Sequence, residues 1–372
     1  MRTSVFQRIW LPGFLLQSVV IGGGYATGRE LVEFFLKSGP VGALLGMLVA
    51  TVLFSVSSAL CFELARLTRS YNYRRFFQQL LGRGWFVYEI AYFVLGLLVL
   101  AVIGAAAGEL SSEHLRLSPT AGTVVLTVLI GILVFLGTPL IEKALAGWSL
   151  LLYATYTLLV GSYLWHFGDK LVPALTSSPV HVDWFVNGFR YFGYNAAIIP
   201  IILFCVRHMQ SRRDAFTAGA LAGPLVMIPA YLLLIAMAVS YPEILGAAVP
   251  ADFMMLQLGL PWLQIVFYVV IFGTFVETGT AFIHAVNERV DEACRAKYGV
   301  MPRWLRAVVA FTGLISALSL ATAIGLIDLI AKGYGTLTWI FIVVFIVPLC
   351  TVGAWKILHL KDLGSISGGT PA

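Results

Sequence analysis

The chain alternates between long apolar stretches and short polar segments over most of its length. Each apolar stretch is close to the roughly 20 residues that an α-helix needs to cross the hydrocarbon of a bilayer. The pattern predicts about ten membrane-spanning helices, at residues 9–36, 40–65, 85–110, 119–137, 139–166, 184–206, 214–240, 262–288, 304–324 and 334–358. We therefore expect an all-α integral membrane protein.

The first predicted span is interrupted by the polar, glycine-rich segment 21–30. Three consecutive glycines fall near its centre, and the charged pair Arg29 and Glu30 follows. Non-helical backbone is tolerated at that depth only where protein buries it or a water-filled cavity receives it, and intramembrane charges are usually functional. The segment therefore indicates a ligand site. Close helix packing is the alternative, because Gly24 and Gly28 form a small-xxx-small face.

The predicted spans divide into two sets of five around the polar segment 168–182. Because five is odd, the second set enters the membrane from the opposite side, as an inverted repeat requires. The sixth span has Gly193 and Asn195 near its middle and Pro200 shortly after, so the first and sixth helices are both expected to be discontinuous. The expected parts are a first five-helix repeat, an outer connecting loop, a second and inverted five-helix repeat and a disordered cytoplasmic tail, at residues 1–167, 168–182, 183–359 and 360–372.

The composition excludes a soluble domain. Only 11% of the residues are charged and 59% are hydrophobic, whereas soluble domains have about 25% charged residues. Most of the 24 lysines and arginines fall in loops on the side of the N-terminus, which by the positive-inside rule predicts that both termini are cytoplasmic. We expect a multi-pass protein of the plasma (inner) membrane whose partners are lipid and a small-molecule substrate, and not nucleic acid.

The two interruptions have the residue types of a substrate site. Backbone N–H groups at the start of the outer half of the first span favour an anionic group such as a carboxylate. Aromatic rings beside the breaks can pack an apolar substrate or hold an ammonium group, and ordinary helix packing is the alternative. The predicted substrate-binding residues are Gly22, Gly23, Gly24, Tyr25, Thr27, Phe192, Gly193, Tyr194 and Asn195.

A carboxylate within the eighth span, Glu277, is a candidate for ion coupling. An acid at that depth costs at least about 2.5 kcal/mol by insertion scales, so it is expected to be paired, protonated or exposed to a cavity. The alternative is a structural ion pair with Arg29 or Arg190. Hydroxyls on the same helix face and carbonyls before the first break can also hold a cation. The predicted ion-coupling residues are Glu277, Thr274, Thr278, Val20, Ile21 and Glu30.

Three charged residues, Arg29, Arg190 and Asp328, fall toward the outer half of the predicted spans. Ion pairs among them would form an outer gate that closes over the substrate, and a static salt-bridge network is the alternative. The sequence has no nucleotide-binding loop, zinc-protease motif or metal-spaced ligand cluster. We therefore expect no enzyme activity, no cofactor and no metal other than a coupling ion.

The segment 22–31 and the phenylalanine pair at 34–35 resemble the YkvI-like membrane proteins, which read roughly G-x-G-[FY]-A-[ST]-G-x-E followed by a Phe pair. That group is similar to a branch of the amino acid–polyamine–organocation (APC) superfamily, whose members have the LeuT fold. The resemblance implies a 5+5 inverted repeat in which spans one, two, six and seven rock against spans three, four, eight and nine. It also implies that substrate binds between the two breaks.

In sodium-coupled relatives, carbonyls before the first break and hydroxyls on span eight bind Na⁺. The matching positions here are 20–22 with Thr278, joined by Thr274. The chain departs from that pattern by placing Glu277 beside the hydroxyl. Some proton-coupled relatives have a lysine in span five, and Lys143 is an imperfect match because it lies near the inner end of that span. Coupling is open between H⁺ and Na⁺, and Glu277 favours H⁺ slightly.

Together these features predict a secondary active transporter of a small amino-acid-like or amine solute that works by alternating access. A non-transporting membrane receptor or sensor that retains the fold is the alternative. Ligand binding without counterflow in proteoliposomes would distinguish the receptor from the transporter.

Overall fold

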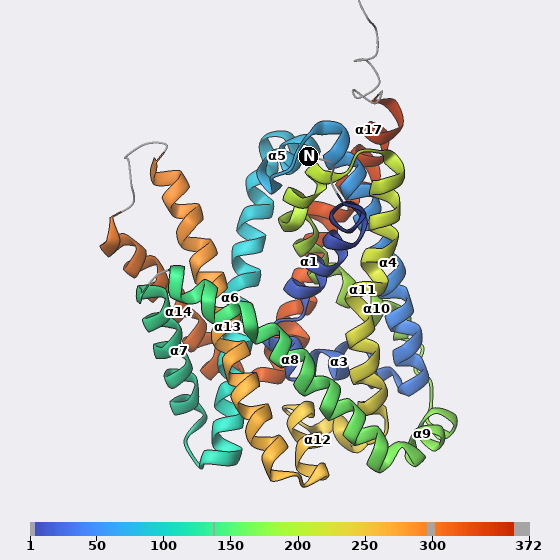
Figure 1. The fold of residues 1–372 in the computed structure, drawn as a ribbon, viewed down its shortest axis with the longest axis vertical. Coiled ribbons are helices and arrows are strands. Elements are labelled where there is room, and N and C mark those ends of the chain that lie inside the picture. Colours follow the sequence, from blue (N-terminus) through green and yellow to red (C-terminus); the bar gives the residue numbers. More distant parts are fainter. Residues whose placement is uncertain (1–3, 137, 296–301, 361–372) are drawn as a thin grey trace, which may run out of the picture.

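The computed structural model describes residues 4–136, 138–295 and 302–360, and all regular elements in this part of the chain are helices (Figure 1). The longer helices are α1 (Leu11–Val20), α4 (Pro40–Thr68), α6 (Trp85–Leu115), α7 (Pro119–Leu136), α8 (Thr138–Phe167), α10 (Trp184–Asn195), the 3₁₀-helix η5 (Ala196–His208), α11 (Arg212–Ala238), α13 (Pro261–Arg295) and α14 (Arg303–Ile324). The shorter helices are η1 (Phe6–Trp10), α2 (Gly23–Ala26), α3 (Arg29–Phe34), η2 (Leu36–Ser38), α5 (Tyr73–Leu81), η3 (Gly82–Gly84), η4 (Gly168–Lys170), α9 (Leu171–Ser177), η6 (Glu243–Gly246), α12 (Pro250–Leu258), α15 (Leu326–Asp328), η7 (Leu329–Tyr334), α16 (Gly335–Phe341), η8 (Ile342–Ile346), η9 (Leu349–Gly353) and α17 (Ala354–His359).

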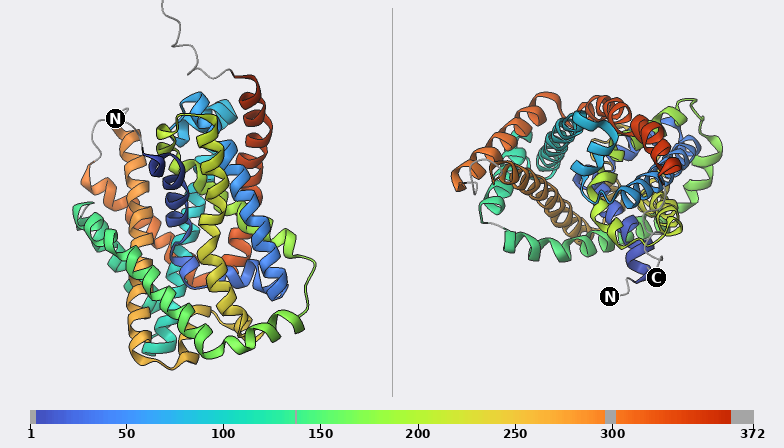
Figure 2. Two further views of the ribbon diagram at one scale, coloured as in Figure 1. Left: turned by 45° about the vertical axis from the view of Figure 1, so that its right-hand side comes forward. Right: turned by 90° about the horizontal axis from the view of Figure 1, so that it is seen from above.

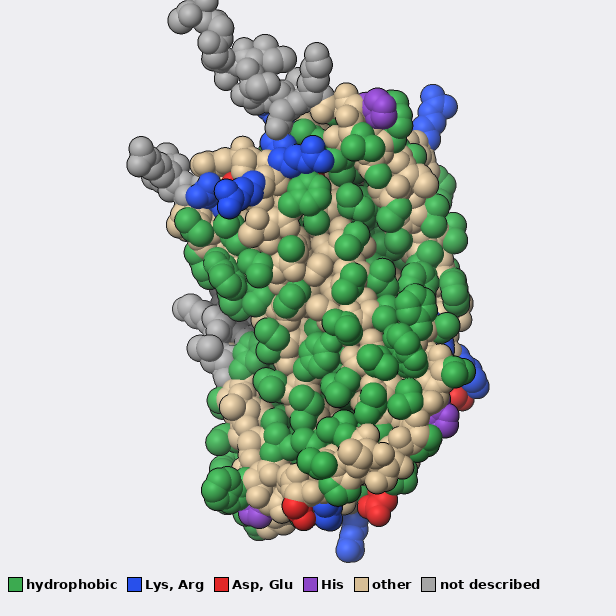
Figure 3. All heavy atoms as spheres, turned by 90° about the vertical axis from the view of Figure 1, so that its right-hand side faces the viewer, with side chains coloured by type: hydrophobic (Ala, Val, Ile, Leu, Met, Phe, Trp, Pro, Cys, Tyr) green, Lys and Arg blue, Asp and Glu red, His purple; other side chains and the backbone are tan. Residues whose placement is uncertain are grey.

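Within the described residues, 7 helices are long and apolar enough to cross a membrane. They are Pro40–Thr68, Tyr73–Leu115, Trp184–His208, Arg212–Ala238, Pro261–Asp291, Trp304–Ile324 and Leu326–His359. The other predicted spans correspond to α7, to α8 and to the interrupted run from α1 to α3. On the face shown in Figure 3, hydrophobic side chains cover the middle between two charged ends. The all-α membrane architecture is confirmed, and the count of ten spans remains a prediction.

Two regions of the sequence predictions lie outside what the structure describes. They are the tail from residue 361 onward and the side chain of Lys143.

The helices pack into two groups. In the bundle group, α4 packs on α10 and α11, and α1 packs on α11 and η5. In the scaffold group, α6, α7, α13 and α14 contact one another. The two groups lie at opposite sides of the molecule in Figure 1, and α8 crosses obliquely between them (Figures 1 and 2). This packing agrees with the predicted division of the spans into a bundle and a scaffold.

The first predicted span is interrupted twice. After α1, Ile21 adopts φ −80° and ψ 77°, and the N–H of Gly22 donates to the carbonyl of Val20 at 2.9 Å, which is the geometry of an inverse γ-turn. Gly22 is extended, and α2 forms a single turn. Gly28 then takes φ 77°, a left-handed conformation that favours glycine, before α3 begins. The expectation of a single outer half-helix is therefore wrong, because the two short helices α2 and α3 follow the break.

The second interruption differs in kind. The helix α10 passes directly into η5, a 3₁₀ stretch of 13 residues that contains Pro200, although 3₁₀ runs longer than three or four residues are uncommon. Gly193 stays helical, and a Cβ atom there would lie 2.6 Å from Cγ2 of Thr338 in α16. The unwound break expected at Gly193 is therefore a change of helix type after Asn195, because the glycine serves close packing of α10 against α16.

Candidate substrate site

The first break is pressed against the scaffold group. The N–H of Gly23 donates to Oγ1 of Thr278 in α13 at 3.1 Å, and a Cβ at Gly22 would lie 3.7 Å from the same oxygen. A Cβ at Gly23 would lie 2.5 Å from Cγ2 of Ile103 and 2.9 Å from Cδ1 of Phe275. Only glycine allows the backbone of the break to approach α6 and α13 this closely.

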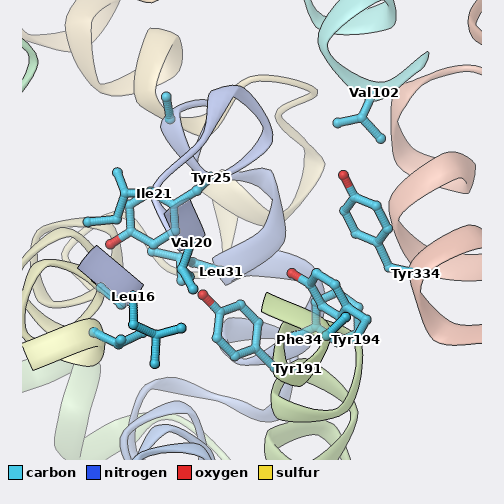
Figure 4. Packing of buried hydrophobic residues seen from close by; sticks show 14 of the residues in the cluster. Leu16, Val20, Ile21, Tyr25, Leu31, Phe34, Val102, Tyr191, Tyr194 and Tyr334 are labelled. Carbon is cyan, nitrogen blue, oxygen red and sulfur yellow. The ribbon is translucent and has the colours of Figure 1, made fainter. Parts of the chain in front are cut away.

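The carboxylate of Glu30 faces the bundle group. Its side chain is buried, and the hydroxyl of Tyr194 in α10 donates to its Oε2 at 2.5 Å. A Cβ at Gly24 would lie 2.5 Å from the other carboxylate oxygen. The ring of Tyr194 stacks on Tyr334 with centroids 4.6 Å apart, and Figure 4 shows these two rings beside each other. The acid is thus enclosed between the first and sixth predicted spans.

The neighbouring arginine points instead to the segment 241–260, which we call the outer segment because the predicted orientation places it outside the cell. The guanidinium of Arg29, only 2% exposed, donates to the carbonyls of Leu245 and Ala247, each at 2.9 Å. It also donates to the carboxylate of Glu33 at 3.0 Å. Arg29 therefore has a neutralising partner on its own helix and holds the outer segment against the first break.

The other two predicted gate residues lie apart from Arg29. Arg190 donates to the carbonyl of Ala331 at 3.2 Å, and its guanidinium carbon lies 5.7 Å from the centre of the Phe34 ring. Asp328 pairs with Lys332 at 3.0 Å. In this conformation the ion pairs between these arginines and Asp328 are not formed among the described residues. Their role as a gate remains a prediction.

The predicted ion-coupling residues of α13 separate into two environments. Thr278 reaches the first break, and Glu277 beside it is partly exposed. The Thr274 hydroxyl donates to the carbonyl of Val270 at 2.8 Å and accepts a hydrogen bond from Nε1 of Trp148 at 3.2 Å. Both intramembrane arginines bond to other groups, so the structure does not support the structural ion pair that was the alternative for Glu277.

Two oxygen atoms beside the break suit a hard cation such as Na⁺. The Val20 carbonyl accepts the N–H of Gly22, and the Thr278 hydroxyl oxygen accepts the next N–H along the chain, from Gly23. Each oxygen keeps a second lone pair. These oxygens are of the type that the predicted cation site at positions 20–22 with Thr278 needs, and the site remains a prediction.

Three predicted substrate-binding residues make contacts within the protein. The Thr27 hydroxyl donates to a carbonyl three residues earlier at 2.7 Å and so supports the turn of the break. The Phe192 ring packs edge-on against Phe54 in α4, with centroids 5.2 Å apart. The Asn195 amide donates to the carbonyl of Tyr191 at 3.1 Å. Contact of these three residues with substrate remains a prediction.

A cavity of about 290 Å³ opens beside the first break, between α8 and α11. Its lining residues are Ile21, Tyr25, Ala26, Leu152, Tyr153, Tyr156, Thr157, Val160, Gly161, Pro229, Leu232 and Leu233. Of the predicted substrate-binding residues only Tyr25 lines it. Sequence reasoning missed the walls because α8 and α11 read as ordinary apolar spans, and no glycine-rich break marks them.

A second polar cluster lies where the outer segment meets the scaffold group. Nε2 of His114 in α6 lies 2.8 Å from Oδ2 of Asp252 in α12, and the hydroxyl of Tyr268 in α13 donates to Oδ1 of Asp252 at 2.7 Å. Glu113 stands beside them, so that its carboxylate, the imidazole and the Asp252 carboxylate place ligand atoms within 4.8 Å of one another. Glu113 and His114 are adjacent in the sequence, but no local spacing joins them to Asp252 or Tyr268.

Comparison with known proteins supports the fold but assigns no family. No family model matches the chain. It is 27% identical over 215 residues to the uncharacterized membrane protein YkvI of Bacillus subtilis (strain 168), a match that covers 56% of this chain and 60% of that relative's length. The narrower expectation of membership in the APC superfamily remains a prediction.

One solved transporter structure shares the arrangement of helices. A Na⁺-coupled sialic acid symporter in a substrate-bound outward-open state matches with a TM-score of 0.53 at 12% identity, covering 92% of this chain and 84% of that one. A manganese transporter of Eremococcus coleocola has a TM-score of 0.46 at 16% identity, with 97% and 88% of the two chains covered. The chain is an all-helical integral membrane protein. At 12% identity the likeness to the symporter concerns the fold alone.

Proposed function

We propose that this protein is a secondary active transporter of a small amine or amino-acid-like solute and works by alternating access in the plasma membrane. One observation carries the proposal: the first break is held by both helix groups. Gly23 bonds to Thr278 of the scaffold group, and Glu30 bonds to Tyr194 of the bundle group. Any movement of one group against the other changes at least one of these contacts, so binding at the break and movement are coupled.

The charge at the site favours a solute with an amine group. Glu30 is buried, and the hydrogen bond that it accepts from Tyr194 comes from a neutral group. A carboxylate in such surroundings is stabilised by a cationic partner or by a proton. An ammonium group on the solute would be the cationic partner, and a coupled proton would neutralise the carboxylate.

The coupling ion is H⁺ or Na⁺, and H⁺ is slightly favoured. Glu30 and the partly exposed Glu277 supply carboxylates that can carry a proton, whereas Val20 and Thr278 supply oxygens that suit Na⁺. Similarity in fold to a Na⁺-coupled symporter supports ion coupling and leaves the choice of ion to experiment.

Uptake into proteoliposomes tests the proposal. Radiolabelled amino acids and amines are offered to the proteoliposomes under an inward proton gradient (acidic outside), under an inward Na⁺ gradient, or without a gradient. We expect accumulation driven by one gradient, and we expect Glu277→Gln and Gly24→Ala each to reduce it at least tenfold. The Gly24 variant places a methyl group against the Glu30 carboxylate, because its Cβ would lie 2.5 Å from Oε1.

Two matched variants serve as controls. Asp169→Asn removes an exposed acid in η4, and Gly131→Ala adds a methyl group in α7, where the nearest atom would be Leu314 Cδ1 at 3.7 Å. Both should transport normally. Normal uptake by the Glu277 and Gly24 variants would contradict the site, and binding of solute without counterflow would favour a receptor.

A further inference from the structure

The cavity beside the first break has a size that fits a ring system. Its volume is about 290 Å³, and a cavity of about 150 Å³ in another protein is large enough to bind benzene. Its walls come from the first break, from α8 and from α11, and its lining includes no charged side chain. These walls are aliphatic and aromatic apart from the tyrosine hydroxyls and Thr157. The cavity therefore suits an apolar body of one or two fused rings.

Among the lining residues, Tyr25 has a buried hydroxyl without a hydrogen-bond partner in the described part of the chain. The hydroxyl of Tyr25 is buried and forms no hydrogen bond among the described residues, and the same is true of Tyr191. By contrast, the hydroxyl of Tyr156 donates to the carbonyl of Ala26. Figure 4 shows that the Tyr25 and Tyr191 hydroxyls both point toward the segment of Val20 and Ile21. A buried hydroxyl without a partner is rare in proteins, so the Tyr25 hydroxyl calls for a partner that the described residues do not supply.

We infer that this cavity binds the apolar ring of the solute, and that the Tyr25 hydroxyl forms a hydrogen bond with a neutral polar group on that ring. The inference rests on the proposed function and narrows its substrate class to amines or amino acids with a bulky apolar side chain. Ile21 and Tyr25 lie on the break itself. A ring in the cavity is therefore adjacent to the backbone that both helix groups hold.

Gly161 of α8 offers a way to fill the cavity without disturbing the fold. It lines the cavity, and a Cβ added there meets no atom within 4 Å. Gly161→Met therefore adds a flexible apolar side chain at the cavity wall with no clash at its Cβ. Gly131→Met is the matched control, because this glycine of α7 is equally tolerant, with its nearest contact at 3.7 Å, and does not line the cavity.

Indole and indene are the probes, since the two bicyclic molecules have nearly the same shape and only indole carries an N–H. Binding is measured calorimetrically on the full chain in nanodiscs, with empty nanodiscs subtracted to remove partitioning into lipid. We expect both probes to bind, and Gly161→Met to weaken both at least tenfold while Gly131→Met leaves them unchanged. Tyr25→Phe should weaken indole several-fold and leave indene unaffected.

Three outcomes would overturn the inference: no binding of indole above empty nanodiscs, equal loss in the Gly161 and Gly131 variants, or equal sensitivity of both probes to Tyr25→Phe. Uptake of glycine and of phenylethylamine by the same preparations separates this inference from the proposed function. If uptake persists while indole fails to bind, the cavity assignment is wrong and the transporter stands. If indole binds as expected but no solute is taken up, the cavity is a binding site and the transport function is wrong.

Discussion

At the scale of single residues, the hydrogen bond between Tyr194 and Glu30 is the most consequential contact of the site. It joins α10 to α3 across 164 positions of sequence at 2.5 Å. A buried carboxylate is costly unless a donor or a charge compensates it. Tyr194 supplies that donor, and the neighbouring Tyr191 on the same helix has a buried hydroxyl that forms no hydrogen bond with any described residue.

The two tyrosines therefore provide a matched pair of variants. Tyr194→Phe should lower the unfolding free energy by about 1 kcal/mol, because it removes a buried hydrogen bond to a carboxylate. Tyr191→Phe should leave the stability unchanged, since it removes a hydroxyl without a protein partner. Thermal unfolding of both proteins in detergent is the measurement. Equal destabilisation by the two substitutions would contradict the Glu30 contact.

At the scale of elements, the first and sixth spans are interrupted in different ways. The first span is broken twice, at Ile21–Gly22 and at Gly28, and this exposes backbone N–H groups to the scaffold group. The sixth span stays helical and changes from α to 3₁₀ winding after Asn195. In the first span glycine serves both conformation, at Gly28, and close approach, at Gly23, whereas Gly193 of the sixth span serves close packing alone.

Gly28 tests the importance of the second turn. Its φ of 77° is strained for any other residue, so Gly28→Ala should destabilise the protein by about 1–2 kcal/mol. The added methyl group would also lie 3.3 Å from Cβ of Pro250 and push the outer segment away, so uptake should fall as well.

Gly259→Ala is the control for backbone strain alone. Gly259 has φ 62° at the end of α12, and a Cβ there meets nothing within 4 Å. This variant should lose comparable stability in thermal unfolding and keep its uptake. Loss of uptake to the same extent in both variants would show that strain, and not the position of Gly28, is responsible.

At the scale of the whole molecule, the outer segment 241–260 joins the two helix groups. Arg29 holds it to the first break through two carbonyls. Asp252 holds it to the scaffold group through His114 and Tyr268. The site is therefore covered at the end of the molecule where α9 and α12 lie (Figure 1). On the face seen in Figure 3, lysines and arginines gather at the opposite end, beside α5 and α17, and charges of both signs mix at the α12 end.

This charge distribution predicts the orientation in the membrane. By the positive-inside rule the end with α5 and α17 should be cytoplasmic, so a green fluorescent protein fused to the C-terminus should fluoresce in cells. Alkaline phosphatase fused within the segment 168–182, near α9, should be active because it is exported. An inactive phosphatase at that position together with a dark C-terminal fusion would indicate the reverse orientation.

The sequence by itself determined the membrane-spanning helices, the glycine-rich break at 21–30 and the candidate carboxylates, because hydropathy and glycine preference are local properties of the chain. Only the tertiary structure decided that Gly193 packs and does not unwind, that Glu30 and Arg29 face different partners, and that α8 and α11 enclose a cavity beside Tyr25. Those features depend on which surfaces meet across long sequence separations. The local sequence pattern does not show which helix surfaces are in contact, because these contacts form only when helices that are distant in the sequence pack together.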